Sequence, residues 1–431
     1  MLFGLPAIVG LVPLIIYIVL SFRDMNPVLN VGMCVILSAI LTKQDLFSFG
    51  EVLANSLGSF LGIIGFIIMI GSGLGAILQK TGVAEFLVMS LTKKIGVDTK
   101  TKAIIVTMVS SLLLVSLLGT LAGANAIIAP IIIPLVAAIG ITPSVVAIVF
   151  LGAGLTGMFL GPYTPQVVTI MGITKLSYGN YLLGVGVPLA IVVLIVTFFS
   201  AKHTQKKTEG IYAYEDIEKH DGNYQASTEV KRASLIFAVI MLALIAYGIF
   251  LQSGANYAIL VIIVTSLVTG FAGGLKANDV VDTFVGGCSK MMWLFIMFIL
   301  FDPFINFIAE AGSFESLVAM LQPLFKSQSK VIFSFVSTLT GIFGVGGAAT
   351  ADNIVMDNMF KGLVTSLKIS PSLWGLILLV SGQITSFAYP EADMVGQMGL
   401  ARSKDMKNLV KFGLIVVAAS LVLVLVRSFF G

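Results

Sequence analysis

The sequence predicts an all-α polytopic membrane protein made of two inverted-topology repeats, with re-entrant hairpins and broken helices. Three observations predict this class: the composition, the recurrence of long apolar runs and an internal repeat. Hydrophobic residues make up 58% of the 431 residues and charged residues only 11%, and the mean hydropathy is +1.06. These values lie far outside the range of soluble globular proteins, so we expect the chain to be solvated mainly by lipid.

Apolar runs long enough to cross a bilayer, at about 20 residues each, recur along the whole chain. Examples are "LPAIVGLVPLIIYIVLSF", "AIIVTMVSSLLLVSLLGTL" and "LIFAVIMLALIAYGIFL". Because lipid cannot satisfy bare backbone polar groups, we expect helices, and the runs are too long and too uniformly apolar for barrel strands. The run from Leu2 to Phe22 follows no basic stretch and has no small-residue cleavage site, so we interpret it as a retained span rather than a signal peptide.

One long polar segment, from Lys202 to Arg232, divides the chain near its middle. It contains six basic and six acidic residues, which is typical of a solvated linker rather than of a specific binding surface. We therefore predict a first transmembrane repeat over residues 1–200, a polar cytoplasmic linker over 201–232 and a second transmembrane repeat over 233–431.

The segments on either side of this linker repeat each other. "GITPSVVAIVFLGAGLTGMFLGP" ends at Pro162 and "KISPSLWGLILLVSGQITSFAYP" ends at Pro390, a shift of 228 positions. Without a gap, the same shift pairs Pro143 with Pro371, Gly154 with Gly382, and Asn125 with Asn353. Shared apolar composition explains matching leucines and valines, but it does not explain coincident proline, glycine and asparagine positions.

Basic residues in the loops predict how the repeats are oriented, since such residues stay preferentially on the cytoplasmic side. Five lysines lie between residues 80 and 102, whereas the equivalent stretch of the second half, about 308–330, has two. Conversely, four basic residues crowd 402–411, where the first half has Lys175 alone. An outside amino terminus then inverts one half relative to the other, which is characteristic of alternating-access transporters with a central site between the halves.

Each half contains two places where residues that disfavour helix interrupt the apolar sequence. Proline removes a backbone donor and glycine lowers helix preference by about 1 kcal/mol, so we expect short extended or re-entrant turns there. Within a membrane such turns need protein or a watery cavity around them, and their freed carbonyl and amide groups can hold ions. In the first half the interrupting residues are Gly119, Gly123, Asn125, Pro130 and Pro134, and then Gly161, Pro162 and Pro165. In the second half they are Gly344, Gly346, Gly347, Asp352 and Asn353, and then Pro390, Glu391 and Asp393.

Acidic residues within apolar sequence mark the candidate site, because a carboxylate at the membrane centre costs about 2.5–3.5 kcal/mol. Asp352 is the strongest candidate because it lies beside the repeated Asn353, and Glu391 and Asp393 follow at the second break. No arginine lies in the middle of an apolar span, so the site favours Na⁺, H⁺ or an ammonium group over a polyanion. The other residues expected to line it are Thr120, Gly123, Asn125, Thr156, Thr164, Thr169, Gly347 and Gln383. A Na⁺ ion is expected at Asn125, Asp352 and Asn353, where oxygen ligands suit a hard cation.

The stretch "ITPSVVAIVFLGAGLTGMFLGPYTPQVVTIMGIT", preceded by "GTLAGANAIIAPIIIP", resembles the core of the NhaC-type sodium/proton antiporters and, more widely, of the ion transporter superfamily. The resemblance implies inverted halves with helical hairpins and broken helices, often in homodimers. NhaC-type proteins carry aspartates where this chain reads "GPYTPQVVT", so plain Na⁺/H⁺ exchange does not follow from it, and Glu391 and Asp393 are candidates for the missing charge. The positions that it carries over as cavity-lining are Gly161, Thr164, Pro165 and Thr169.

These features predict a secondary active transporter that moves a small organic solute, an amino acid or a small carboxylate, by alternating access with Na⁺ or H⁺ as the coupling ion. A Na⁺/H⁺ antiporter without organic cargo is the alternative, and a channel is a third reading that the paired breaks disfavour. A membrane-embedded enzyme would need a nucleophile, a metal cluster or a histidine pair near the interface. Because His203 and His220 both fall in the polar segment, we expect no enzymatic activity and no cofactor.

The remaining expectations concern partners and location. The net charge of +4 is a sum over loops rather than a patch, so we expect no nucleic-acid partner. We expect the lipid bilayer and a small-molecule or ion substrate as partners, and assembly as a homodimer. The expected location is a prokaryotic cell (inner) membrane, which the chain crosses several times.

Overall fold

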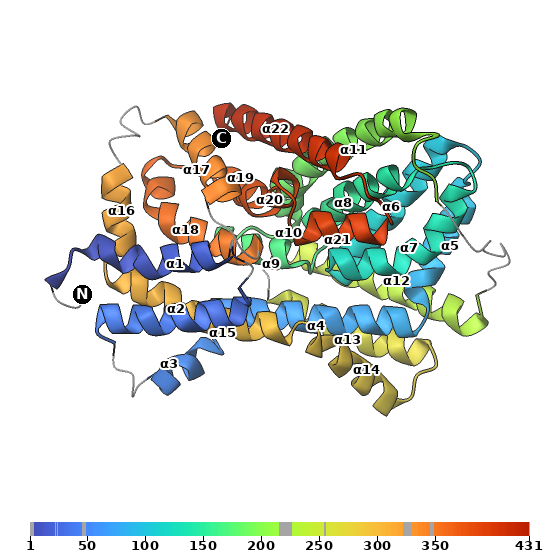
Figure 1. Ribbon diagram of the computed structural model, residues 1–431. Helices are drawn as coiled ribbons and strands as arrows, with labels where there is room; N and C mark the ends of the chain where they lie inside the picture. Colours follow the sequence, from blue (N-terminus) through green and yellow to red (C-terminus); the bar gives the residue numbers. More distant parts are fainter. Residues whose placement is uncertain are drawn as a thin grey trace.

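The computed structural model describes residues 4–21, 23, 25–44, 49–214, 226–253, 256–321, 329–344 and 349–430. In these ranges all regular elements are helices, and most of the long ones run along one common direction (Figure 1). Seven of the described helices are long and apolar enough to cross a bilayer. The predicted class, an all-α polytopic membrane protein, is therefore confirmed.

The helices of the first half are separated by short connections. They are η2 (Ala7–Leu11), α1 (Val12–Ser21), α2 (Pro27–Thr42), α3 (Phe49–Ser56), α4 (Phe60–Lys80), α5 (Val83–Ile95), α6 (Lys100–Leu118), α7 (Leu121–Ala137), α8 (Pro143–Leu160), α9 (Pro165–Thr174), α10 (Tyr178–Tyr181), the π-helical turn η3 (Leu182–Gly186) and α11 (Val187–Thr208).

The second half follows the polar segment. Its helices are α12 (Thr228–Phe250), α13 (Tyr257–Ala272), α14 (Ala277–Ser289), α15 (Met292–Glu310), α16 (Ser313–Leu321), α17 (Lys330–Gly344), α18 (Ala349–Ser366), α19 (Pro371–Gln383), α20 (Thr385–Ala388), α21 (Ala392–Leu400) and α22 (Met406–Phe430). Helices α11 and α12 both extend into the segment that the composition assigns to the linker.

The helix contacts repeat between the two halves. Helix α6 packs against α8 as α17 packs against α19, α5 contacts α7 as α16 contacts α18, and α4 contacts α14 as α15 contacts α3. Counterpart helices lie toward opposite ends of the molecule. In Figure 1, α5 lies at the right and its counterpart α16 at the left, and likewise α14 lies at the right and its counterpart α3 at the left. This arrangement is that of inverted repeats.

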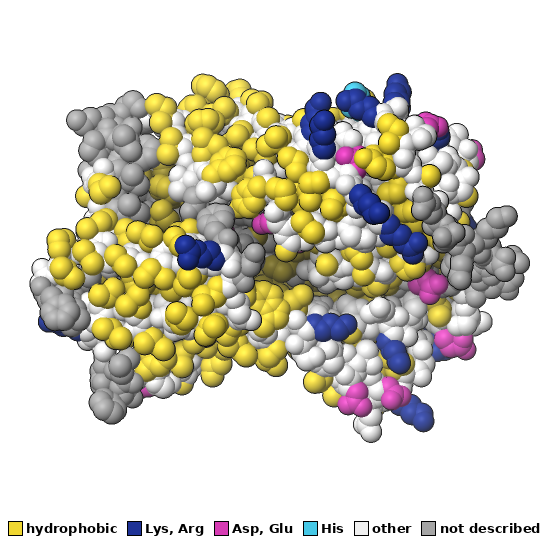
Figure 2. All heavy atoms as spheres, viewed as in Figure 1, with side chains coloured by type: hydrophobic (Ala, Val, Ile, Leu, Met, Phe, Trp, Pro, Cys, Tyr) yellow, Lys and Arg dark blue, Asp and Glu magenta, His cyan; other side chains and the backbone are white. Residues whose placement is uncertain are grey.

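The charged side chains mark one end of the molecule. Figure 2 shows Lys and Arg gathered toward the right-hand end of this face, around α5, α14 and the start of α22, while hydrophobic side chains cover much of the left-hand part. Basic loop residues stay preferentially on the cytoplasmic side. We call this end the basic end.

The broken span of the first half lies at the centre of the protein. The stretch Pro143–Thr174, which comprises α8, the break and α9, is almost entirely buried, far more than the other long apolar spans. The break itself falls between Gly161 and Thr164, where the sequence predicts it. In the second half the equivalent break lies between α20 and α21, at Tyr389–Glu391.

The prediction that Pro130 and Pro134 open the chain was wrong, because α7 continues through both. Only Gly119, with a positive φ of 65°, and the extended Thr120 separate α6 from α7. A proline within a helix leaves one backbone carbonyl unpaired, and membrane helices tolerate this where another group or a watery cavity can satisfy it. The carbonyl that Pro130 leaves unpaired belongs to Ala126, and both residues line a cavity.

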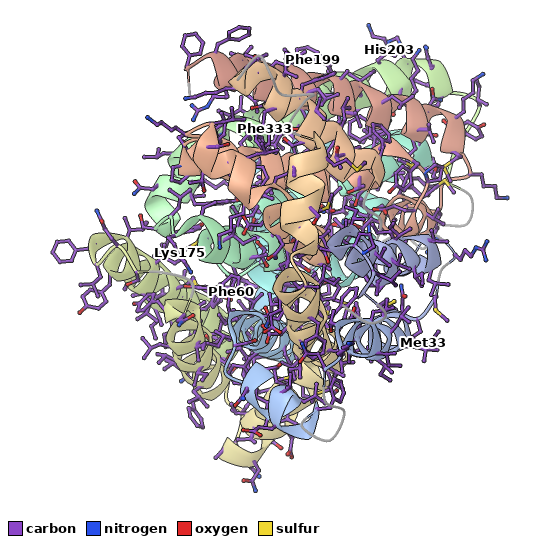
Figure 3. All side chains as sticks on the ribbon, turned by 90° about the vertical axis from the view of Figure 1, so that its left-hand side faces the viewer. Met33, Phe60, Lys175, Phe199, His203 and Phe333 are labelled. Atoms are coloured by element: carbon purple, nitrogen blue, oxygen red, sulfur yellow. The ribbon has the colours of Figure 1, made fainter. Side chains whose placement is uncertain are left out.

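A contact between α4 and α9 holds the broken span against the surrounding helices. Gly172 has no side chain where Phe60 packs, so a Cβ atom there would collide with the phenyl ring. The Lys175 ammonium lies 5.1 Å from the centroid of the same ring, and Figure 3 shows the two residues close together. The cation adds an electrostatic attraction to the ring face.

Candidate functional site

The short helix after each break crosses to the opposite half of the protein. Helix α21 of the second half packs against α7 and α8 of the first, and α9 of the first half packs against α18 and α19 of the second. We call these two places the first crossing and the second crossing. They are related by the internal repeat, so the residues at each can be compared position by position.

At the first crossing, Asn125 has all of its amide groups engaged. Its Nδ2 donates to Gln397 Oε1 at 2.7 Å and to the Phe150 carbonyl at 3.1 Å, and its Oδ1 accepts from Ser111 Oγ at 2.7 Å. The side chain is fully buried. Asn125 therefore links the two halves, and both polar atoms of its side chain are hydrogen-bonded.

At the second crossing, Asp352 and Asn353 are also buried, but they lack hydrogen-bond partners among the described residues. Neither carboxylate oxygen of Asp352 and neither amide atom of Asn353 makes a hydrogen bond within the described ranges. Buried polar groups in proteins are nearly always paired. The side-chain atoms of Asp352 and Asn353 therefore need a bound ligand, a proton or a hydrogen-bond partner.

A glycine on the facing helix packs against each asparagine. A Cβ atom on Gly382 of α19 would lie 2.6 Å from Asn353 Oδ1 and 2.7 Å from the Ala349 carbonyl. A Cβ atom on Gly154 of α8 would lie 3.1 Å from Asn125 Nδ2. Both glycines let an asparagine approach the backbone of the facing helix, which gives the glycine and asparagine coincidences of the repeat a physical reason.

Further buried oxygens without a partner in the described part of the chain lie on the helices of the second crossing. Helices α9, α18 and α19 all contact one another. The atoms concerned are Gln166 Oε1 and Thr169 Oγ1 on α9 and Ser381 Oγ and Gln383 Oε1 on α19. Oxygen atoms are the ligands that suit a hard cation.

Three threonines predicted for the site form hydrogen bonds with backbone groups. Thr164 Oγ1 donates to the Met158 and Gly161 carbonyls at 2.7 and 2.9 Å, and Thr156 Oγ1 donates to the Gly152 carbonyl at 2.8 Å. Thr120 caps α7 by accepting from the backbone of Gly123 at 3.4 Å. Thr164 thus satisfies carbonyls that the first break exposes.

The acidic residues of the second break are only half-buried. Ser386 Oγ donates to Asp393 Oδ2 at 3.0 Å, and Glu391 directly precedes α21. Both Glu391 and Asp352 lie within electrostatic range of the Tyr389 hydroxyl. The second break therefore lies near the start of α18.

Within the described ranges, no ion pair joins Asp352 to a fixed cation. The ion pairs of the described residues are Lys100 with Glu209 and Lys102 with Asp98, all exposed, and the hydrogen bond from Lys100 lowers the pKa of Glu209. On the same helix as Asp352, Asp357 accepts from Trp374 Nε1 at 2.8 Å. Asp352 is thus the only carboxylate in the described ranges that is buried with both oxygens unpaired.

Sequence reasoning did not identify Gln397 and Ser111, which complete the first crossing. A signal for Gln397 existed, because the shift of 228 positions aligns it with Thr169. Gly347, another predicted site residue, lies outside the described residues. No group of three or more His, Cys, Asp or Glu side chains suited to a metal ion occurs within them.

A cavity of about 560 Å³ runs along one face of α7. Gly123, Ala126 and Pro130 line it from α7, Glu85 lines it from α5, and Lys290 lines it from the loop before α15. Because α5 and α14 lie at the basic end (Figure 1), the cavity extends from that end toward the start of α7. We call it the vestibule.

Inverted repeats whose broken helices cross between the halves, with buried oxygens at one crossing, define a secondary transporter of the membrane. Residues 1–180 match the model of the Na⁺/H⁺ antiporter family. This match confirms the similarity to sodium/proton antiporters that the sequence indicates.

The fold is similar to that of the Alcanivorax borkumensis YdaH transporter, whose crystal structure revealed an unusual topology. The TM-score is 0.63 and the identity 15%, over 94% of this chain and 99% of that one. No curated protein matches the chain. At this identity the likeness concerns the fold alone.

Proposed function

We propose that the protein exchanges Na⁺ for H⁺ and that Asp352 and Asn353 hold the coupling ion. The observation that carries this proposal is the buried Asp352 carboxylate, which has no hydrogen-bond donor or fixed cation in the described ranges. An isolated buried charge is costly unless it is paired or neutralised. Either a sodium ion or a proton can neutralise it, but not both at once, and such competition at one carboxylate produces antiport.

One ion site per chain follows from the broken symmetry of the two crossings. The repeat aligns Asp352 with Ala124, so the first crossing has no carboxylate. Its asparagine, Asn125, is already paired with Ser111, Phe150 and Gln397. We therefore place the ion at Asp352 and Asn353 and assign Asn125 a structural role.

The coupled movement of a small organic solute is a second candidate, favoured by the size and lining of the vestibule. Its volume of about 560 Å³ falls within the range of ~300–1,000 Å³ typical of small-molecule sites. Glu85 and Lys290 bring opposite charges to it, which suits a zwitterion such as an amino acid better than a polyanion.

We further propose that the protein works in a prokaryotic cell (inner) membrane as a homodimer, with the polar linker in the cytoplasm. The positive-inside rule applied to the basic end supports this orientation. The broken, crossing helices suit transport rather than catalysis, and we propose no enzymatic activity.

Proteoliposomes test the proposed exchange. With no organic solute present, an imposed Na⁺ gradient should change the pH of the lumen, and Asp352→Asn should abolish that change while leaving the protein folded. Asp357→Asn is the matched control, because the same substitution on the same helix keeps an oxygen that accepts from Trp374. Undiminished exchange by Asp352→Asn would refute the assignment, and a strict requirement for an added zwitterion would favour the second candidate.

A further inference from the structure

A groove of about 320 Å³ lies on the outer surface between α11 and α22. These two helices pack against each other along their length. Phe199 and Ile195 on its α11 side are 64% and 52% exposed, and Figure 3 shows Phe199 and His203 at the outer edge of the molecule. The lining residues are Ile195, Val196, Phe199, Ser200, His203 and Thr204 from α11, and Asn408, Lys411, Phe412 and Ile415 from α22.

The groove changes from apolar to polar along its length. On α11, Ile195, Phe199 and His203 follow each other at intervals of four residues and so share one face. Helix α22 runs in the opposite direction, from Lys411 near the basic end to Ile415 deeper in the membrane. Both helices therefore present apolar side chains toward the membrane interior and polar ones toward the basic end.

The polar end of the groove has a positive balance of charge. Lys411 lines it, and the exposed Lys207 and Lys407 belong to the same ends of α11 and α22. Of the nearby acids, Asp405 is buried and accepts from the side chain of Asn408 at 2.6 Å, and Glu209 pairs with Lys100. Basic residues at the membrane surface attract anionic lipid headgroups.

We propose that this groove binds an anionic phospholipid of the leaflet at the basic end. One acyl chain lies along Ile195, Phe199 and Ile415, and the phosphate faces Lys411 and His203. Inorganic phosphate would leave the apolar part uncovered. A second copy of the chain fits less well, because a two-fold contact here would place the lysines of both basic ends against each other.

Thermal melting of the full-length protein in detergent tests the proposal, since a ligand that binds the folded state raises the melting temperature. Added phosphatidylglycerol should raise it, and phosphatidylcholine at the same concentration should raise it less than half as much. Lys411→Glu combined with His203→Gln should remove this preference. Lys276→Glu, which changes an exposed lysine away from the groove, should keep it.

A second variant leaves the charges in place. Ile195→Trp fills the apolar part of the groove and should also remove the preference for phosphatidylglycerol. The proposal would be overturned if the two lipids raised the melting temperature equally, or if inorganic phosphate raised it as much as phosphatidylglycerol does. It would also be overturned if phosphatidylglycerol stabilised the Lys411→Glu/His203→Gln protein as much as the unsubstituted one. If Ile195→Trp converted a dimer to a monomer and left the lipid preference unchanged, the groove would be occupied by a second copy of the chain, and the proposal would also be overturned.

Discussion

The side-chain amide of Asn125 donates to Gln397 Oε1 at 2.7 Å and thereby joins the two halves of the protein. The repeat aligns these residues with Asn353 and Thr169, whose polar side-chain atoms are buried without partners in the described part of the chain. A threonine side chain is shorter than that of glutamine and has no amide to offer. The two crossings therefore differ at two aligned positions, Gln397 against Thr169 and Ala124 against Asp352.

Gln397→Ala should weaken the link between the halves without affecting ion binding. The substitution removes one interhelical hydrogen bond of Asn125, and such bonds within membranes contribute about 1 kcal/mol. The melting temperature in detergent should fall, while the stabilisation by added Na⁺ should stay unchanged. A loss of the Na⁺ response at an unchanged melting temperature would show that Gln397 is itself an ion ligand.

Thr169→Gln should convert the second crossing into a copy of the first. The longer side chain can accept from Asn353 Nδ2, as Gln397 Oε1 accepts from Asn125 Nδ2, and its bulk would fill space beside the oxygen that an ion would use. We expect a higher melting temperature without Na⁺ and at least about a tenfold loss of Na⁺ affinity, equivalent to 1.4 kcal/mol. Thr169→Val is the matched control, since it removes the hydroxyl without adding an amide. Thr156→Gln would not serve, because the Thr156 hydroxyl donates to a carbonyl of its own helix.

Gly382→Ala should impair ion binding by displacing Asn353. The new Cβ atom would lie 2.6 Å from Asn353 Oδ1 and 2.7 Å from the Ala349 carbonyl, both too close, so the asparagine must move. We expect at least about a tenfold weaker Na⁺ response, again 1.4 kcal/mol. Gly154→Ala is the matched control at the first crossing: it should lower the melting temperature but leave Na⁺ affinity intact. Equal effects of the two substitutions on Na⁺ affinity would contradict a single site.

The helical class and the two breaks that precede α9 and α21 follow from the local sequence and could be predicted. Proline and glycine at Gly161 and Pro390 act through their own backbone geometry, whatever surrounds them. Asp352 and Asn353 could be singled out because an acid next to a repeated polar residue in apolar sequence is rare.

The contacts across the two halves could not be predicted from the sequence. The bond between Asn125 and Gln397 exists only because α21 packs on α7, which is a tertiary event separated by 272 positions along the chain. The same limit explains the wrong prediction at Pro130, where a cavity beside α7 lets the helix continue. Local propensity identifies residues that disturb a helix but not the surroundings that tolerate them.

Proton competition should be visible as a pH-dependent affinity for Na⁺. A proton on Asp352 removes the charge that attracts the ion, so the apparent Kd for Na⁺ should rise as the pH falls. Na⁺-induced thermal stabilisation measured over a series of pH values reports this directly. In the Asp352→Asn protein no such pH dependence should remain. A wild-type Kd that does not change with pH would argue against exchange at this carboxylate.

The vestibule should be accessible to water from the basic end. Ala126 of α7 is exposed to the cavity, whereas Ala124, two positions earlier on the same helix, is fully buried. A membrane-impermeant maleimide should therefore label Ala126→Cys in inside-out vesicles and leave Ala124→Cys unlabelled. The native Cys34 and Cys288 are buried, so their thiols should contribute little background.

Labelling at Ala126→Cys also separates the two candidate functions. A maleimide adduct would occupy much of the vestibule but touches neither Asp352 nor Asn353, which lie at the second crossing. If a zwitterion moves through the vestibule, a zwitterion added at the basic end should protect the cysteine from labelling, and the adduct should block its transport. If the vestibule only conducts Na⁺, amino acids should give no protection, while Na⁺-dependent stabilisation of the labelled protein should match that of the unlabelled one. Labelling only from the opposite side of the membrane would overturn the orientation inferred from the basic end.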